Sequence, residues 1–250
     1  MADLIENEIV QGDCNEIIKE IPENSVDMIF TDPPYFISNE VVITRGRNKM
    51  KFKGPDIIQD FGDWDKFDSL GSYFKWTFKW VDLSVRVLRY GGMFCSYFDR
   101  DKISFLSRYL QDKHKFKCKG YYADAKSNPV PQARKVKWMN GWEEIGLWQK
   151  SGGKLTYNYQ LGQHKDYGIR PIVSGKERLK HPTQKPESTI KDFILYWSNE
   201  GDLILDPFSG VGSVAVVCKK LNRRYIGIEQ SEEYCEMAKD RLRNTEKPLF

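Results

Sequence analysis

Residues 203–220, LILDPFSGVGSVAVVCKK, decide the fold of this chain. An apolar run ends at Asp206, a Gly-x-Gly turn follows at Gly210 and Gly212, and Ser213 opens a stretch with helical character. A strand, a glycine-rich turn and a helix N-terminus in this order form a nucleotide-binding turn, because the glycines let the backbone approach the ligand closely. The stretch therefore predicts an α/β fold with a ligand site at this turn.

The chemistry around the turn narrows the class of ligand. The next predicted strand, 224–228, runs into Glu229, which stands 17 positions after Gly212, a spacing that suits a carboxylate binding ribose hydroxyls. Position 215 is alanine, so the dinucleotide pattern Gly-x-Gly-x-x-Gly is incomplete. Asp206 would repel a pyrophosphate but could receive a cationic ammonium group. These features favour S-adenosylmethionine over NAD, and a tight loop without a ligand is the alternative left open.

A second motif, Asp32-Pro33-Pro34-Tyr35, follows the apolar run 26–31. Proline lacks a backbone N–H and fixes φ, so two prolines in succession end the predicted strand in a stiff turn. The turn offers a carboxylate, a carbonyl and an aromatic ring, which together could hold the amino group of a planar base. A strand-ending turn with a solvated aspartate is the alternative for this motif read alone.

Strands and helices alternate along the chain, which is typical of α/β folds with a largely parallel sheet. We expect Gly91 and Gly92 to end a helix at 69–89. Asp32 and Asp206 both follow predicted strands, so we expect them to lie side by side where ligands bind in such sheets. Further strands are expected at 9–11, 93–98, 116–123, 144–149 and 202–205, and further helices at 15–21, 101–113, 187–198, 213–221 and 231–244.

Length and composition indicate one large domain, or a domain with a sizeable insertion, that can bury a real core. The chain has 250 residues, of which 40% are hydrophobic and 14% aromatic, and a net charge of +4. Residues 126–180 hold eleven Lys and Arg against four acids, which could be a solvated face but also suits a polyanionic substrate. Residues 36–62 show no clear period, carry five basic residues from 45 to 53, and are expected to form a mobile loop.

The remaining composition points to a reducing compartment. The five cysteines are odd in number and widely spaced, and with the three histidines they show no metal-ligand spacing, so no metal site is expected. The N-terminus lacks the apolar core of a signal peptide, and no apolar stretch approaches the length of a membrane span. We therefore expect a cytoplasmic protein.

Together the two motifs resemble those of amino-methylating DNA methyltransferases. Asp32 to Tyr35 is similar to the catalytic motif for N6-adenine or N4-cytosine, residues 206–213 to the S-adenosylmethionine motif, and residues 181–186 to the segment that precedes it. The catalytic motif comes before the cofactor motif, an order that resembles the circularly permuted β class of bacterial and phage modification enzymes. The resemblance covers 9–150 and 181–243.

The resemblance implies a Rossmann-like methyltransferase fold, a mostly parallel sheet with helices on both faces, and a role for each motif residue. It places target recognition in an insertion at about 151–180, with DNA as partner, in a bacterial cell or a phage-infected host. The family includes dimers, and both a monomer and a homodimer stay open. By this resemblance, the cofactor would contact Asp13, Cys14, Asp32, Thr183, Lys185, Asp206, Phe208, Gly210, Gly212, Ser213 and Glu229.

Within those implied roles, Phe208, Gly210, Gly212 and Ser213 would line the methionine part of the cofactor, and Glu229 would take the ribose hydroxyls. Asp13 and Cys14 would contact its adenine, although Cys14 could equally be a buried small thiol. Thr183 and Lys185 would approach its carboxylate. His181 is expected to be a structural hydrogen-bonding residue and not a catalyst.

The predicted reaction is methyl transfer to the N6 amino group of a flipped adenine. Asp32 and the Pro33 carbonyl would accept the amino hydrogens, Pro34 would stiffen the turn, and Tyr35 would stack on the base. Asp at position 32 favours adenine, whereas Ser there would favour cytosine-N4. Three alternatives stay open: an N4-cytosine DNA methyltransferase, an NAD-linked oxidoreductase, and a non-catalytic nucleic-acid-binding protein.

Overall fold

The computed structural model describes residues 6–36, 41–43, 57–59, 67–131, 138–179, 181 and 183–246. Most of the predicted loop at 36–62 lies outside these ranges. Its two described stretches are short strands, β3 (Val41–Ile43) and β4 (Ile57–Gln59), which pair antiparallel where the sequence predicted no regular structure. No helix within the described ranges combines the length and apolar character needed to cross a membrane.

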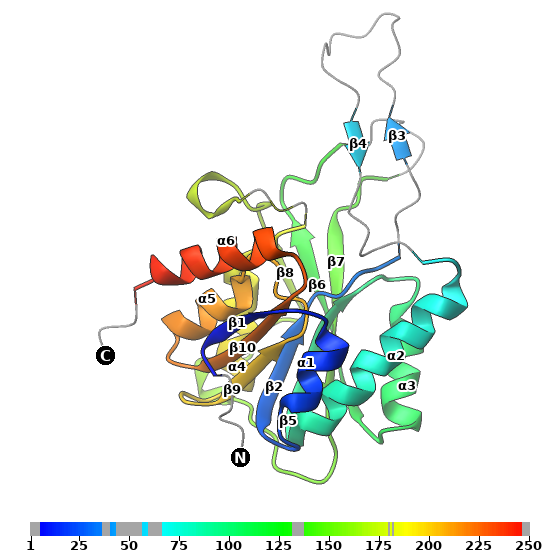
Figure 1. The fold of residues 1–250 in the computed structure, drawn as a ribbon, viewed down its shortest axis with the longest axis vertical. Coiled ribbons are helices and arrows are strands. Elements are labelled where there is room, and N and C mark those ends of the chain that lie inside the picture. Colours follow the sequence, from blue (N-terminus) through cyan, green and yellow to red (C-terminus); the bar gives the residue numbers. More distant parts are fainter. Residues whose placement is uncertain are drawn as a thin grey trace, which may run out of the picture.

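An eight-stranded sheet forms the centre of the molecule, in the order β1-β10-β9-β2-β5-β7-β6-β8 (Figure 1). Its neighbours pair parallel except β7, which runs antiparallel to both β5 and β6, so the predicted mostly parallel sheet is confirmed. The strands are β1 (Glu8–Gln11), β2 (Val26–Thr31), β5 (Leu88–Phe98), β6 (Lys117–Lys126), β7 (Trp142–Gln149), β8 (Tyr167–Arg170), β9 (Leu203–Asp206) and β10 (Arg224–Glu229).

Helices cover both faces of this sheet, as predicted (Figure 1). One face carries α1 (Cys14–Glu20), α2 (Leu70–Val87) and α3 (Ile103–Asp112), and the other carries α4 (Glu187–Trp197), α5 (Ser213–Lys220) and α6 (Glu232–Arg243). Two 3-10 turns, Tyr159–Leu161 and Gly175–Glu177, lie within the 151–180 segment.

The two faces have separate apolar cores because side chains alternate along each strand. In β2, Met28 and Phe30 pack with α4, α5 and α6, whereas Ile29 packs with α1, α2 and α3. The Phe30 ring lies 5.1 Å from that of Phe193, and Phe30 is 1% exposed. Full burial of a side chain of this size stabilises the fold by roughly 1.5–3 kcal/mol.

The end of α2 differs from the sequence prediction. The helix ends at Val87, and Gly91 and Gly92 lie within β5. A Cβ on Gly92 would sit 2.7 Å from the Asp27 carbonyl oxygen, so glycine is required there for close approach of two strands. The buried Lys150 ammonium donates to the Leu88 carbonyl at 2.5 Å, and so satisfies a backbone acceptor just after the helix end.

The sheet changes direction between β9 and β2, and this position creates the site. From β9 the chain passes through α5 to β10 on one side, and from β2 it continues through α2 to β5 on the other. Ligands of open α/β sheets bind at the carboxyl ends of strands at such a switch point. The predicted juxtaposition of the two motifs is confirmed, because β2 and β9 are hydrogen-bonded neighbours.

Candidate active site

The carboxyl ends of β2 and β9 are joined by a buried hydrogen bond. The Thr31 hydroxyl donates to Oδ1 of Asp206 at 2.8 Å, and the Phe208 N–H donates to the same oxygen at 3.1 Å. Asp206 is 4% exposed, and burial raises the pKa of its carboxyl group to about 7 despite these two donors. The carboxyl group is thus held in a fixed orientation, and its charge lacks a nearby cation within the described residues.

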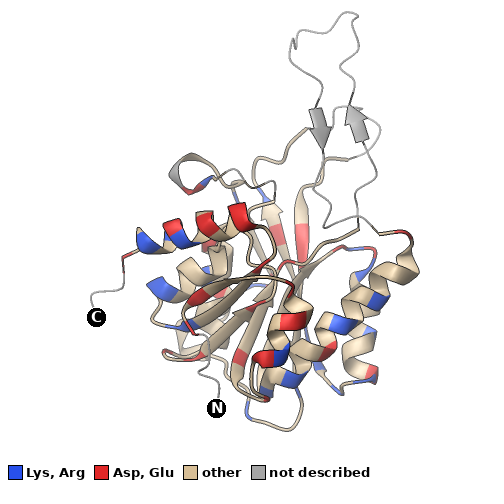
Figure 2. Ribbon diagram, in the orientation of Figure 1, with Lys and Arg blue, Asp and Glu red and all other residues tan. Residues whose placement is uncertain are grey.

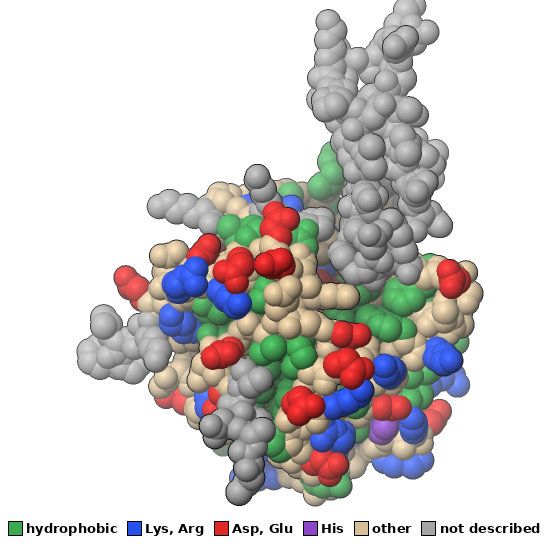
Figure 3. All heavy atoms as spheres, viewed as in Figure 1, with side chains coloured by type: hydrophobic (Ala, Val, Ile, Leu, Met, Phe, Trp, Pro, Cys, Tyr) green, Lys and Arg blue, Asp and Glu red, His purple; other side chains and the backbone are tan. Residues whose placement is uncertain are grey.

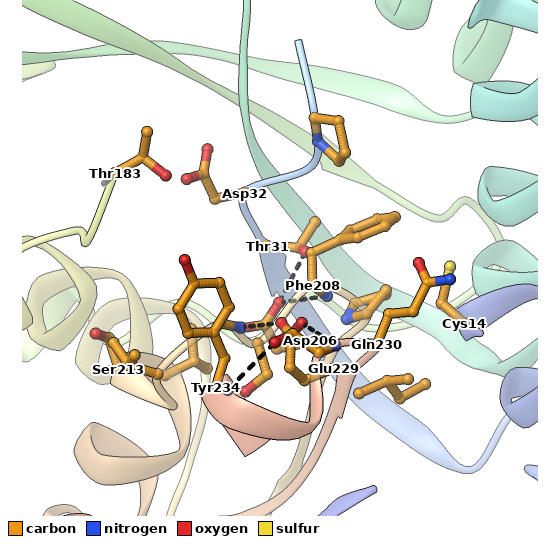
Figure 4. Close-up of a pocket in the computed structure, with 18 of the residues that line it drawn as sticks. Cys14, Thr31, Asp32, Thr183, Asp206, Phe208, Ser213, Glu229, Gln230 and Tyr234 are labelled. Atoms are coloured by element: carbon orange, nitrogen blue, oxygen red, sulfur yellow. Dashed lines mark hydrogen bonds between the residues drawn. The ribbon is translucent and has the colours of Figure 1, made fainter. Parts of the chain in front are cut away.

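A cavity of about 570 Å³ opens at this junction. Figure 4 shows Asp32 and Thr183 at one end of it and Cys14 and Gln230 at another. Of the residues predicted from the sequence, the cavity is lined by Asp13, Cys14, Asp32, Pro34, Thr183, Lys185, Asp206, Phe208, Gly210, Ser213 and Glu229. Pro33, Tyr35 and Gly212 do not line it.

Both glycines of the turn adopt positive φ, Gly210 at 51° and Gly212 at 75°, a conformation that other residues rarely take. Their surroundings differ. A Cβ on Gly210 would lie 3.0 Å from the His181 ring, at the cavity wall, whereas one on Gly212 would lie 2.9 Å from the Ala238 Cβ in α6. Gly210 therefore shapes the cavity, and Gly212 allows α6 to pack against the turn.

Glu229 lies at the end of β10 and is fixed by backbone donors. Its Oε2 accepts the Gly210 N–H at 2.8 Å and its Oε1 accepts the Ser231 N–H at 2.8 Å (Figure 4). Burial raises the pKa of this carboxyl group above its usual value, while the backbone donors act in the opposite direction. The carboxylate is preorganised at the cavity wall, as a site for hydroxyl groups requires.

Asp13 and Cys14 lie where β1 gives way to α1. The Asp13 side chain accepts the Asn15 N–H at 2.8 Å and so caps the helix N-terminus. Burial, with a smaller contribution from Asp13, raises the pKa of the Cys14 thiol to about 12. Cys14 is therefore a buried thiol of low reactivity at the cavity wall, which suits contact with a planar ring.

The carboxylate of Asp32 is engaged on both oxygens. The Tyr35 hydroxyl donates to Oδ1 at 2.5 Å, and the Lys185 ammonium lies 3.0 Å from Oδ2. The Pro34 carbonyl accepts a hydrogen bond from the Tyr73 hydroxyl at 3.0 Å, which anchors the turn to α2. Burial raises the pKa of Asp32, and Lys185 acts against that rise.

Sequence reasoning missed Glu143, which lies on β7 and forms an ion pair with Lys185. A second ion pair, 2.5 Å long, joins Glu143 to Lys126 at the end of β6. Although burial opposes ionisation, Lys185 and then Lys126 hold the pKa of Glu143 at about 2. The Lys185 ammonium thus lies between two carboxylates, a placement that its predicted approach to a cofactor carboxylate did not include.

His181 lines the cavity beside Tyr234, with 4.7 Å between the ring centroids. Its Nδ1 is buried and has no hydrogen-bond partner among the residues described, so its predicted hydrogen-bonding role stays a prediction. Burial, Lys185 and Arg178 lower the pKa of His181 to about 4, which leaves the ring neutral at neutral pH. An uncharged ring is compatible with the predicted non-catalytic role.

The basic segment 126–180 contributes part of its charge to the fold itself. Lys126 pairs with Glu143, the Arg170 guanidinium contacts Asp192, and the Lys150 ammonium donates to backbone carbonyls. Figure 2 shows basic and acidic positions distributed over both helical layers. On the face seen in Figure 3, acidic side chains gather at the start of α6 and basic ones toward its end, and both signs are mixed over α1 and α2. That face is therefore not a continuous basic surface.

The chain matches, over residues 26–240, a family model described as DNA methylase and named for N6 and N4 methyltransferases. It is 34% identical to the Type II methyltransferase M.HinfI of Haemophilus influenzae, over 95% of this chain and 68% of that protein. It is also 34% identical to the Type II methyltransferase M2.DpnII of Streptococcus pneumoniae, over 94% of this chain and 88% of that protein.

Solved structures agree with the family match. The M1.HpyAVI–SAM complex superposes with a TM-score of 0.73 at 26% identity, covering 94% of this chain and 98% of that one. The cytosine-N4-specific PvuII DNA methyltransferase shares the fold, with a TM-score of 0.71 at 16% identity over 93% of this chain and 85% of that one. The match over most of the chain, and the two motifs that meet at one cavity, show that the chain belongs to the DNA methylase family of N6 and N4 methyltransferases.

Proposed function

We propose that the protein transfers the methyl group of S-adenosylmethionine to the N6 amino group of adenine in DNA. One observation carries the proposal: the Asp32 carboxylate and the Asp206 turn lie on one cavity, at the switch point of the sheet. An amino-group acceptor and a cofactor turn are the two parts that direct methyl transfer needs, and proximity supplies much of its rate. The names of the type II relatives favour a modification enzyme.

The cavity residues fit S-adenosylmethionine. The cavity volume lies in the range of small-molecule sites, roughly 300–1,000 Å³. The carboxylates of Glu229 and Asp206 suit ribose hydroxyls and an ammonium group, and Ser209 Oγ is buried without a hydrogen-bond partner in the described ranges. When bound, S-adenosylmethionine supplies an electrophilic methyl group on sulfur. The predicted contacts of Asp13 and Cys14 with its adenine, and of Phe208 and Ser213 with its methionine part, are part of this proposal.

Asp32 and the carbonyl of Pro33 would accept the two hydrogens of the exocyclic amino group. This localises the nitrogen lone pair, which is otherwise delocalised into the ring, and directs it toward the methyl group. As the nitrogen–carbon bond forms, the carbon–sulfur bond of the donor would break with its electron pair left on sulfur, and the nitrogen would then lose one proton to solvent. Acceptors that are already fixed need no reorganisation during transfer, and the contacts to Asp32 and Pro34 fix this turn.

Tyr35 has two possible positions in this scheme. Its hydroxyl holds Oδ1 of Asp32, the oxygen that the amino group would need. Binding of the base therefore exchanges this hydrogen bond for one from the amino group, and frees the Tyr35 ring to stack on the base. Stacking of an aromatic ring on a base contributes roughly 1–3 kcal/mol.

The choice of adenine rests on Asp32, because an aspartate at this position favours adenine and a serine favours cytosine-N4. The family covers both bases, so cytosine-N4 is the second candidate. The amino group is inaccessible in a duplex, so the base must be flipped out. We place target recognition in the 151–180 segment, whose β8 strand extends the sheet beside β6.

The experiment is transfer of tritium from methyl-labelled S-adenosylmethionine to unmethylated DNA, followed by digestion to nucleosides. We expect the label in N6-methyl-2′-deoxyadenosine, and none when Asp32→Ala replaces the wild type. Label in N4-methyl-2′-deoxycytidine would show that the target base is cytosine and not adenine. Label in RNA alone, or no label in either nucleic acid, would refute the proposed function.

A further inference from the structure

Four charged side chains of alternating sign form a row of ion pairs that starts at Asp32. Lys185 lies 3.0 Å from Asp32, Glu143 pairs with Lys185, and Lys126 lies 2.5 Å from Glu143. They come from four separate parts of the fold: the end of β2, the segment before α4, β7 and β6. These four side chains are neutral as a group, because each of the two carboxylates is matched by one ammonium group.

The two central side chains of this row, Lys185 and Glu143, are shielded from water. The Lys185 side chain is 11% exposed and that of Glu143 is 22% exposed. Removing charges from water costs several kcal/mol per ion unless each keeps an opposite charge beside it. Although burial favours the neutral amine, Asp32 and Glu143 raise the pKa of Lys185 well above its usual range. Lys185 therefore stays charged, and its position depends on both carboxylates.

Aromatic rings restrict the Lys185 ammonium further. It lies 4.7 Å from the centroid of the Tyr97 ring and 5.5 Å from that of Tyr35. Tyr97 is itself fixed, since its hydroxyl donates to Asp124 at 2.7 Å. If Tyr35 leaves to stack on a base, Glu143 and Tyr97 are the contacts that keep the ammonium in place beside Asp32.

We propose that Glu143 is a positioning residue for methyl transfer, which holds the Lys185 ammonium against Oδ2 of Asp32 and thereby presents Oδ1 to the amino group of the base. The inference rests on the proposed function, because it assigns Asp32 the role of acceptor. Lys126 forms an ion pair with Glu143 and so helps to hold the Glu143 carboxylate in place beside Lys185.

The acid side of the pH–rate profile separates this role from a purely electrostatic effect of the Glu143 charge on Asp32. Glu143 carries a negative charge, so its loss alone would lower the pKa of Asp32 and extend activity to lower pH. Loss of the Lys185 ammonium from its place would do the opposite, because Asp32 would keep the effect of burial without its cation. The ionisable groups around the Asp32 carboxylate are Tyr35, Tyr97, Glu143, Lys185 and Asp206.

The test compares Glu143→Gln with Glu144→Gln in the full-length protein. Glu144 is the next residue on β7, its side chain points to the opposite face of the strand, and it makes a matched control. For Glu143→Gln we expect kcat on DNA to fall about tenfold or more, with the Kd for S-adenosylmethionine within about twofold of the wild type and the acid limb moved to higher pH. Glu144→Gln is expected to match the wild type.

Three results would overturn the inference: a kcat equal to that of Glu144→Gln, an acid limb that moves to lower pH, or a loss of rate that follows a loss of cofactor binding. If Glu143→Gln does not fold, Lys126→Met is measured instead. It keeps Glu143, and a smaller change in the same directions is expected. A wild type that binds S-adenosylmethionine but methylates no DNA would refute the proposed function instead, before any variant is compared.

Discussion

Replacing Asp206 by asparagine should stabilise the ligand-free protein at alkaline pH. The carboxyl group is buried, and its pKa is raised from an ordinary 3.8 to about 7, so the folded state binds the proton more tightly than the unfolded state. The proton on Asp206 contributes its full stabilisation of the folded state below pH 3.8, and this contribution is lost as the pH rises to about 7. The complete loss corresponds to about 4 kcal/mol, as an order of magnitude.

The measurement is urea unfolding of wild type and Asp206→Asn at about pH 5 and about pH 8.5. The advantage of the variant should grow between these pH values by roughly 2–3 kcal/mol, because the wild type loses its proton and the variant has none to lose. Glu20→Gln, which removes an exposed carboxylate from α1, controls for the loss of one negative charge. A stability difference that stays constant with pH would refute the reasoning.

Three further predictions concern the same site. Glu229→Gln should destabilise the protein by about 1–3 kcal/mol and raise the Kd for S-adenosylmethionine about tenfold or more, because Glu229 accepts two backbone N–H groups and a single amide oxygen cannot accept both in the same way. Calorimetry measures the stability and the Kd. An unchanged Kd would contradict the proposed contact of Glu229 with the ribose. The free energy of unfolding of Gly212→Ala should be lower than that of Gly201→Ala by at least about 1 kcal/mol. Both glycines have a left-handed backbone, but only a Cβ at position 212 would lie against α6. Equal unfolding midpoints in denaturant would contradict this. Lys185→Met should lose activity most at low pH and recover part of it as the pH rises, because the Lys185 ammonium counteracts the rise in the pKa of Asp32 that burial causes. A loss of the same size at every pH would show that Lys185 does not act through the pKa of Asp32.

The parts of the fold that could be predicted from the sequence are those set by consecutive residues. The cofactor turn is one, because a strand, Gly210 with Gly212, and a helix follow one another without a gap. The strand before Asp32 is another, since two prolines must end it. The adjacency of the two motifs then followed from the rule that parallel strands present their carboxyl ends on one side of the sheet.

The parts that could not be predicted depend on contacts between distant segments. Glu143 and Lys185 are 42 positions apart, and their ion pair depends on the register of β7, which the sequence does not specify. Gly92 looked like a helix end but serves close approach to β2, which only the paired strands reveal. Lys126 counted as part of a basic surface, yet its partner is an acid inside the fold.

The β8 strand was missed for a related reason. It has four residues, Tyr167–Arg170, and their alternation of exposed and half-buried side chains is too short to stand out among glycines and polar residues. It forms because its backbone pairs with β6, a contact that lies more than 40 positions away in the chain. A strand of this length gains its stability from its neighbour and not from local preference.

The central claim is that Asp32 directs a methyl group to the N6 amino group of adenine in DNA. The most direct measurement is mass spectrometry of nucleosides from unmethylated DNA incubated with S-adenosylmethionine and either the wild type or Asp32→Asn. The account predicts N6-methyl-2′-deoxyadenosine from the wild type, and a level at least about 100-fold lower from the variant at equal cofactor binding. N4-methyl-2′-deoxycytidine as the product, or equal N6-methyl-2′-deoxyadenosine from both proteins, would contradict it.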